Sequence, residues 1–193
     1  MPEGKPDPSW FRAKDPADQI AAAVLVPLYL PAESATPSVV LTRRRADLRR
    51  HAGEISFPGG RRDEDDADLR ETALREAEEE IGLPRELVDP LGELPQISTF
   101  ATNYLIHPFV GLIPPGQDWR ASPREVDAVL ELPLQEIRAS RTRTEIERRG
   151  FTFEVDAYIL GGHLIWGATF RILEDLLAEL QAGAFDDARL ALD

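Results

Sequence analysis

Apolar and polar residues follow one another in blocks whose spacing predicts interleaved strands and helices. Continuous apolar runs at 21–30, 38–42 and 104–113 are typical of strands buried within a sheet. Residues 151–158 alternate between apolar and polar side chains, which indicates a strand with one exposed face. This interleaving predicts an α/β protein.

Three segments are expected to be helical. The first spans about 68–81 and is stopped by Gly82, a residue type that is favoured just past a helix end. The second, rich in arginine and other polar residues, is expected at 134–147. The third carries apolar residues at helical spacing, which should pack on the sheet: Ile172, Leu173, Leu176, Leu177 and Leu180.

The length and the absence of repeats favour a single domain. The chain has 193 residues, enough for one domain of ordinary size with its own core, and it contains no long linker. We expect an N-terminal arm at 1–19, where proline and charge are frequent, one domain at 20–182, and a short C-terminal tail at 183–193. The sequence does not determine the oligomeric state.

The net charge, the lack of cysteine and the lack of long apolar runs exclude several classes of function. The formal charge of −13 argues against non-specific binding to nucleic acid, which depends on a basic surface. With no cysteine, the chain has no disulfide and no thiolate nucleophile. It has no apolar run near the roughly 20 residues of a membrane span, and its N-terminus does not have the pattern of a secretory leader. We therefore expect a cytoplasmic protein that does not bind membranes.

Charge is distributed unevenly within the first half of the chain. Residues 41–62 contain seven arginines and two acids, whereas residues 63–80 contain ten acids and two arginines. A basic segment that leads directly into an acidic one would suit a polyanionic substrate bridged by a metal ion to carboxylates. Surface patches of opposite charge that compensate one another would produce the same pattern. The charge distribution alone is therefore only weak evidence for such a substrate.

The acidic segment ends in a cluster of three carboxylates. Glu76, Glu79 and Glu80 are spaced by three and four residues, so they lie on one side of the predicted helix, where their charges repel. The run from Arg75 to Leu83 reads R-E-U-x-E-E-x-G-U, where U is apolar, and a glycine pair precedes it. This pattern resembles the signature of the Nudix hydrolases. The resemblance implies a mixed β-sheet between α-helices and hydrolysis of a diphosphate joined to another group.

In that family the glutamates bind Mg²⁺ or Mn²⁺, so the resemblance implies that Glu76, Glu79 and Glu80 are metal ligands. Carboxylate oxygens are the hard ligands that these ions prefer. Arg75 is expected to hold one of the glutamates in position, since Glu71 and Glu79 lie four residues to either side of it.

One feature departs from the family pattern. The signature places an acid six residues after the glycine and eight residues before the arginine. Counting forward from Gly60 reaches Asp66, whereas counting back from Arg75 reaches Ala67. The loop therefore has one extra residue, and the role of Asp66 is open.

The basic segment carries a second resemblance. Residues 41–60 are similar to the form L-T-x-R-x₄-R-x₃-G-x₃-F-P-G-G, which marks the coenzyme A pyrophosphatase branch of the Nudix family. Arg44 and Arg49 match its arginines and are candidate phosphate contacts, because a guanidinium offers a planar fork of donors to phosphate oxygens. Gly59 and Gly60 are expected to form a turn that brings the chain close to the glutamate helix.

A further acid lies outside both motifs. Glu125 precedes a predicted strand that ends in Pro-Leu, a place where Nudix enzymes commonly have a glutamate. The resemblance implies that Glu125 is an extra metal ligand or the base that takes a proton from water. The candidate catalytic residues are thus Glu125, Glu80 and Arg75.

The resemblances together imply a metal-dependent hydrolase of coenzyme A, a small-molecule substrate. Its products would be 4′-phosphopantetheine and adenosine 3′,5′-bisphosphate. Two alternatives stay open at this point. One is a Nudix hydrolase of another substrate, such as ADP-ribose, NADH or a damaged nucleotide. The other is a Nudix domain that binds a nucleotide as a sensor without catalysis.

Overall fold

The computed structural model describes residues 18–32, 36–45, 53–99, 102–148, 150–185 and Leu190. Its fifteen elements in chain order are β1 (Ile20–Tyr29), β2 (Ser38–Arg44), β3 (Ile55–Ser56), β4 (Gly59–Arg61), α1 (Leu69–Ile81), a 3-10 turn η3 (Arg85–Leu87), β5 (Asp89–Glu93), β6 (Ile97–Ser98), β7 (Tyr104–Leu112), β8 (Val126–Pro133), α2 (Leu134–Ala139), β9 (Arg141–Arg148), β10 (Phe151–Leu160), β11 (His163–Trp166) and α3 (Gly167–Ala182).

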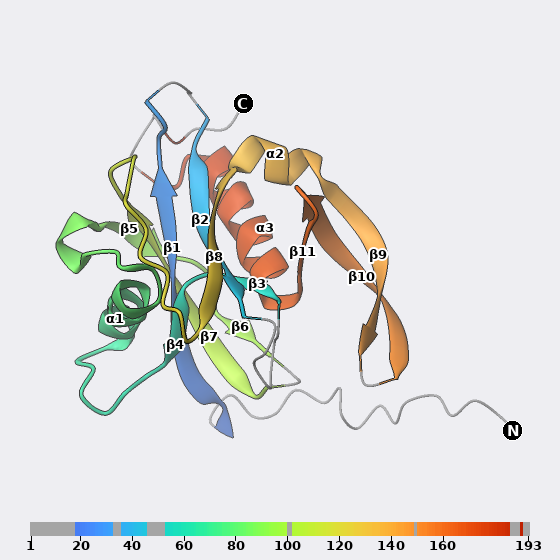
Figure 1. The fold of residues 1–193 in the computed structure, drawn as a ribbon, viewed down its shortest axis with the longest axis horizontal. Helices are drawn as coiled ribbons and strands as arrows, with labels where there is room; N and C mark the ends of the chain where they lie inside the picture. Colours follow the sequence, from blue (N-terminus) through green and yellow to red (C-terminus); the bar gives the residue numbers. More distant parts are fainter. Residues whose placement is uncertain are drawn as a thin grey trace, which may run out of the picture.

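A mixed sheet of eight strands forms the centre of the molecule (Figure 1). Its central strand β1 runs parallel to β7 and antiparallel to β2 and β4. On one side β2 pairs with β3 and β8, and on the other β7 pairs with β5 and β6. A second sheet of three antiparallel strands, in the order β11, β10, β9, lies beside it.

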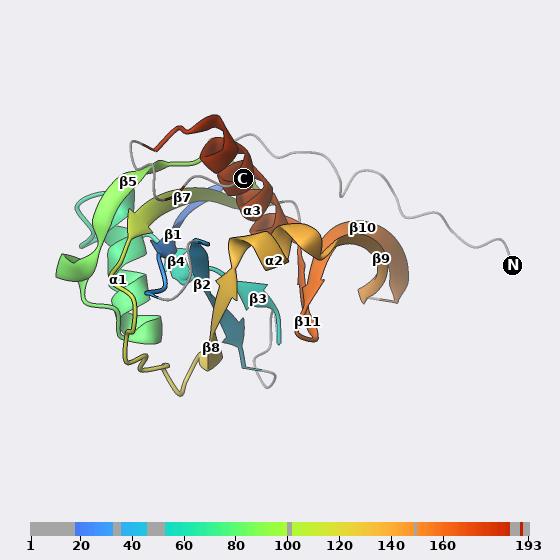
Figure 2. The same cartoon turned by 90° about the horizontal axis from the view of Figure 1, so that it is seen from above.

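The large sheet is buried on both faces. Successive residues of β1 point to opposite sides of the sheet, so the strand contributes side chains to an apolar cluster on each face. Ala23 and Leu25 pack with Ala73, Ala77 and Ile81 of α1 in one apolar cluster. The opposite face of the sheet carries a larger cluster, to which α3 contributes most of its apolar side. The helices α1 and α3 therefore cover opposite faces of the sheet (Figure 2). This confirms the predicted mixed sheet between helices.

The helix predicted at 134–147 is wrong beyond Ala139. α2 ends there, and residues 141–148 form β9, which pairs with β10 along its whole length. The segment reads RTRTEIER, with β-branched residues at every second position. Such residues lose side-chain freedom in a helix and pack well on a pleated sheet, so the strand is favoured once β10 is available as a partner.

The predicted arm at 1–19 falls almost entirely outside the described residues, and so does most of the predicted tail. Leu190, from that tail, is buried against the larger apolar cluster. None of the helices in the described part of the chain is long and apolar enough to span a bilayer.

Candidate metal centre

The helix that carries the glutamates has well-defined ends. Asp68 caps its start by accepting a hydrogen bond from the Glu71 N–H at 2.9 Å. Gly82 ends it in the left-handed conformation, with φ of 70°, and donates its N–H to the Glu78 carbonyl at 3.0 Å. The observed helix, Leu69–Ile81, agrees with the sequence prediction to within one residue.

The three glutamates of α1 differ strongly in exposure. The side chain of Glu79 is 62% exposed and that of Glu76 is 17% exposed, whereas Glu80 is buried with 5% of its side chain exposed. One carboxylate oxygen of Glu80 accepts a hydrogen bond from the Gly59 N–H at 3.3 Å. The other lies 3.7 Å from a guanidinium nitrogen of Arg44. Glu80 is therefore held between the glycine pair and the end of β2.

Burial dominates the electrostatics of this cluster. It raises the pKa of Glu80 to about 8, with smaller contributions from the charges of Glu76 and Glu125, while Arg44 acts in the opposite direction. Burial also raises the pKa of Glu76, and the Arg75 guanidinium only partly offsets this effect. The carboxylates thus sit where additional positive charge would be strongly stabilising.

Arg75 contacts the acid whose role the sequence left open. Its guanidinium donates to both carboxylate oxygens of Asp66, at 2.9 and 3.0 Å, and lies 3.1 Å from Glu76 and 3.5 Å from Glu79. Of the two glutamates at a distance of four residues, Arg75 therefore contacts Glu79, while Glu71 pairs with Arg85 at 3.3 Å. Arg75 links the preceding loop to the glutamate side of α1.

Asp66 is buried and fully engaged despite the extra residue in its loop. Besides the two bonds from Arg75, it accepts hydrogen bonds from the Thr72 hydroxyl at 2.8 Å and from the Asp63 N–H at 2.9 Å. Arg75 and these donors hold the pKa of Asp66 well below its usual range. The loop absorbs the insertion while one acid still reaches Arg75.

The glycine pair forms a strand rather than the predicted turn. Gly59 and Gly60 belong to β4, which pairs with β1. Each lies where a Cβ atom would collide: at Gly59 it would lie 2.4 Å from the Ala23 carbonyl oxygen, and at Gly60 it would lie 2.3 Å from a carboxylate oxygen of Glu76. Close approach to β1 and to the glutamate helix, and not turn geometry, explains why glycine is required here.

Arg44, at the end of β2, and Glu125, in the loop before β8, complete the cluster. The Arg44 guanidinium lies 3.7 Å from Glu125, whose side chain is 51% exposed, and it reaches Glu80 at the same distance. The Ser122 N–H donates to the Glu80 carbonyl at 2.8 Å, which ties the loop before β8 to the last turn of α1. Sequence reasoning missed this anchoring, since it rests on backbone atoms.

The structure therefore brings together eight of the nine predicted site residues, from four separate segments: Arg44, Gly59, Gly60, Arg75, Glu76, Glu79, Glu80 and Glu125. Arg49 lies outside the described residues.

These residues provide suitable chemistry for a divalent cation. Glu76, Glu79 and Glu80 supply carboxylate oxygens, which Mg²⁺ and Mn²⁺ prefer, and the raised pKa values of Glu76 and Glu80 show that the buried charges lack full compensation. In the described part of the chain, no three acidic or histidine side chains converge on one point as they stand. The arginines Arg44 and Arg75 hold the carboxylates instead.

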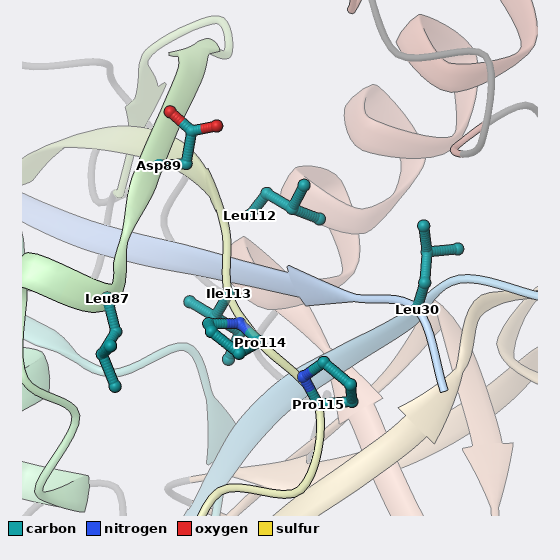
Figure 3. Close-up of a pocket in the computed structure, with 7 residues that line it drawn as sticks. All are labelled: Leu30, Leu87, Asp89, Leu112, Ile113, Pro114 and Pro115. Atoms are coloured by element: carbon teal, nitrogen blue, oxygen red, sulfur yellow. The ribbon is translucent and has the colours of Figure 1, made fainter. Parts of the chain in front are cut away.

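A pocket of about 330 Å³ lies elsewhere, at the carboxyl end of β7. Figure 3 shows that its lining is mainly apolar. The lining residues are Leu30, Leu87, Asp89, Leu112, Ile113, Pro114 and Pro115. None of them is a predicted site residue, so this pocket is separate from the carboxylate cluster.

Comparison with known proteins identifies the family. Residues 19–155 match the model of the NUDIX domain. The chain is 41% identical, over 83% of its length and 84% of the relative, to a protein of Photorhabdus laumondii named uncharacterized Nudix hydrolase NudL. It is 42% identical to a protein of the same name from Cronobacter sakazakii, over 84% of each chain.

Solved structures agree in fold. A Nudix hydrolase from M. smegmatis, RenU, superposes with a TM-score of 0.59 at 16% identity, covering 86% of this chain and 87% of that one. The NUDIX domain of Shewanella oneidensis NrtR, solved with ADP ribose, gives a TM-score of 0.56 at 16% identity, covering 90% and 93%. This chain belongs to the Nudix hydrolase family. It is accordingly a pyrophosphohydrolase of a small nucleoside diphosphate derivative, in a family that generally uses divalent metal ions.

Proposed function

We propose that this Nudix hydrolase cleaves the diphosphate of coenzyme A, or of its derivatives, to 4′-phosphopantetheine and adenosine 3′,5′-bisphosphate. The observation that carries the proposal is the position of Arg44. The segment that resembles the coenzyme A branch delivers this guanidinium to within 3.7 Å of both Glu80 and Glu125. The positive charge of Arg44, from the segment at 41–60, thus lies next to the carboxylates of α1.

Arg44 has the properties of a group that changes partners. Its distances to Glu80 and Glu125 are long for ion pairs, and neither is among the short, well-aligned contacts of the site. Because a guanidinium binds phosphate oxygens in a bidentate manner, a substrate diphosphate would compete well for it. Arg49, five residues further along the same motif, is proposed as a second phosphate contact.

The metal ligands proposed are Glu76, Glu79 and Glu80. Bound Mg²⁺ or Mn²⁺ supplies neutralisation of diphosphate charge and a lower pKa for a coordinated water. For all three side chains to contribute, Glu76 and Glu79 must turn away from Arg75, which they contact at 3.1 and 3.5 Å. Asp66 would keep Arg75 in place during this change, since it makes two shorter bonds to that guanidinium.

Glu125 is proposed as the general base or as a further ligand. Its side chain is half exposed, so it can reach a water molecule, and it lies beside the same Arg44 that contacts Glu80. The loop that carries it is tied to the end of α1 through Ser122. A base must lie within hydrogen-bond reach of the proton that it removes, and this anchoring fixes Glu125 near the signature helix.

Product analysis tests the substrate. The protein is incubated with Mg²⁺ or Mn²⁺ in parallel reactions that each contain one substrate: coenzyme A, ADP-ribose or NADH. The products of each reaction are identified by mass spectrometry. We expect 4′-phosphopantetheine and adenosine 3′,5′-bisphosphate as the fastest products. Faster cleavage of ADP-ribose or NADH would contradict the coenzyme A assignment, and absence of any cleavage would favour a nucleotide-binding sensor.

Two neighbouring arginines on β2 provide a matched comparison for the role of Arg44. Arg44→Gln should lower kcat/KM for coenzyme A by about a hundredfold, since it removes a charged donor from the reacting diphosphate. Arg43→Gln is the control, because Arg43 points to the other side of the strand and pairs with exposed Asp127 at 2.6 Å. Equal effects of the two substitutions would argue against a specific role for Arg44.

A further inference from the structure

The hairpin of β9 and β10 presents a sheet edge that no other described strand covers. In the three-stranded sheet β9 is the outer strand and pairs with β10 alone among the described strands. The hairpin extends away from the body that contains α1 and the large sheet (Figure 1). An edge of this kind offers a row of unpaired backbone N–H and C=O groups, onto which a further strand can add.

The exposed side chains of β9 are sorted by charge along the strand. Arg141 and Arg143 occupy its first half, and Glu145 and Glu147 its second half. Because alternate residues of a strand point to the same side, all four share one face. The opposite face carries Thr142, Thr144 and Ile146, which are half buried.

In the part of the chain that the structure describes, the acids in the second half of β9 have no ion-pair partner of opposite charge. The register with β10 puts Glu145 directly opposite Glu154, and like charges in that position are destabilising. Arg143 lies 3.7 Å from Glu154 and 3.7 Å from Asp156, so it serves the acids of β10. Among the described residues Glu145 has no ion pair of its own, and a cation on its free side would relieve the repulsion.

We propose that β9 pairs with β9 of a second copy of this chain, antiparallel about a twofold axis through Thr144. In that register Arg143 faces Glu145 of the second copy, and Arg141 faces Glu147 of the second copy. The twofold axis repeats both pairs, so four pairs of opposite charge form on one face. The two three-stranded sheets then join into one continuous sheet of six strands.

The charge pattern distinguishes this register from its neighbours. A shift of two residues in either direction would place Glu145 opposite itself or Arg143 opposite itself, both of which are repulsive. A shift of one residue would set the face of the four charged residues in one copy against the face of Thr142, Thr144 and Ile146 in the other. Two positive charges followed by two negative ones are complementary to the same strand reversed, which is the requirement of a twofold interface. This self-complementarity identifies a second copy as the partner.

Sedimentation equilibrium of the full chain tests the assembly. We expect a dimer of twice the 21.5 kDa chain mass. Arg143→Glu places two like-charged pairs in the interface and should raise the dimer dissociation constant by about tenfold or more. Combining it with Glu145→Arg restores both pairs and should return the dissociation constant to near the wild-type value. A wild-type monomer at about 100 µM would overturn the proposal, and so would a dimer that neither variant alters.

Cysteine cross-linking tests the register independently. The chain contains no cysteine, so Thr144→Cys introduces a single thiol at the proposed twofold axis. Directly opposed residues have Cβ atoms about 4.5–5.5 Å apart, close enough for a disulfide after small adjustment. Mild oxidation should give a covalent dimer. Thr152→Cys, exposed on β10 and one strand away from the interface, is the control and should stay monomeric on a denaturing gel. Equal cross-linking of both variants would overturn the register.

Discussion

At the scale of single residues, Glu80 combines the burial, the contacts and the raised pKa that distinguish the site. It is the most buried carboxylate of α1, it contacts Gly59 and Arg44, and its pKa is raised to about 8. A structural acid at this place would be expected to have a full ion pair, since uncompensated buried charge is costly. These properties support the proposal that Glu80 is a metal ligand.

The raised pKa of Glu80 predicts how stability depends on pH in the metal-free protein. Between its ordinary pKa and about 8, Glu80 is ionised in the unfolded state and protonated in the folded state. The folded state then binds more protons, so the free energy of unfolding falls as pH rises through this window. Urea titrations in EDTA should show a fall, at most about 1.4 kcal/mol per pH unit, that Glu80→Gln lacks. Parallel curves for the two proteins would contradict the burial argument.

Asp66 gives the free energy of unfolding the opposite dependence on pH. Its pKa is lowered, so its contribution to stability is present above the usual carboxyl range and is lost as pH falls. Asp66→Asn removes two charge-assisted bonds to Arg75 and should lower the free energy of unfolding by about 2 kcal/mol at pH 7. The deficit should shrink towards pH 3. Exposed Asp65→Asn is the control, and a similar loss in that variant would show that Asp66 has no special role.

At the scale of elements, the site depends on how closely β4 approaches its neighbours. Gly59 abuts the backbone of β1, which cannot move independently, whereas Gly60 abuts the end of the flexible Glu76 side chain. The two glycines therefore serve different purposes although they are adjacent in the chain.

Alanine substitutions should separate those purposes. Gly59→Ala should destabilise the fold by about 1–3 kcal/mol, because a backbone collision must be relieved. Gly60→Ala should cost less stability but lower hydrolysis by about tenfold or more, because it displaces the Glu76 carboxylate. Thermal melts and steady-state rates of both variants check this. Loss of stability in Gly60→Ala with full activity would show that hydrolysis does not depend on the space that Gly60 leaves beside the Glu76 carboxylate.

At the scale of the whole molecule, the sequence predicted elements whose signals are local. Asp68 and Gly82 bound α1 to within a residue, and the apolar runs of β1 and β7 were recognisable on their own. Strand β9 could not be separated from a polar helix, since its conformation depends on pairing with β10. Propensity is a weak guide for such a segment when tertiary partners decide the outcome.

In the site, too, local motifs could be predicted from the sequence, whereas contacts between distant segments could not. The glutamates and glycines were identifiable because they form a compact motif. The approach of Arg44 to Glu80 and Glu125, and the two bonds from Arg75 to Asp66, join segments separated in the chain and brought together by the sheet and its loops. A count of residues could not show that Asp66 still reaches Arg75, because loops absorb insertions by changing their path.

We propose that the buried Glu80 carboxylate of α1 is required for the metal-dependent hydrolysis of coenzyme A by this protein. The most direct measurement is the rate of 4′-phosphopantetheine release with Mg²⁺ for wild type, Glu80→Gln and Glu78→Gln. Glu78 is a matched control on the same helix, since it is exposed and pairs with Arg85 at 2.8 Å. We predict that EDTA abolishes release, that Glu80→Gln lowers it by about a hundredfold or more, and that Glu78→Gln leaves it unchanged. Release by Glu80→Gln at the wild-type rate would contradict the proposed role of Glu80.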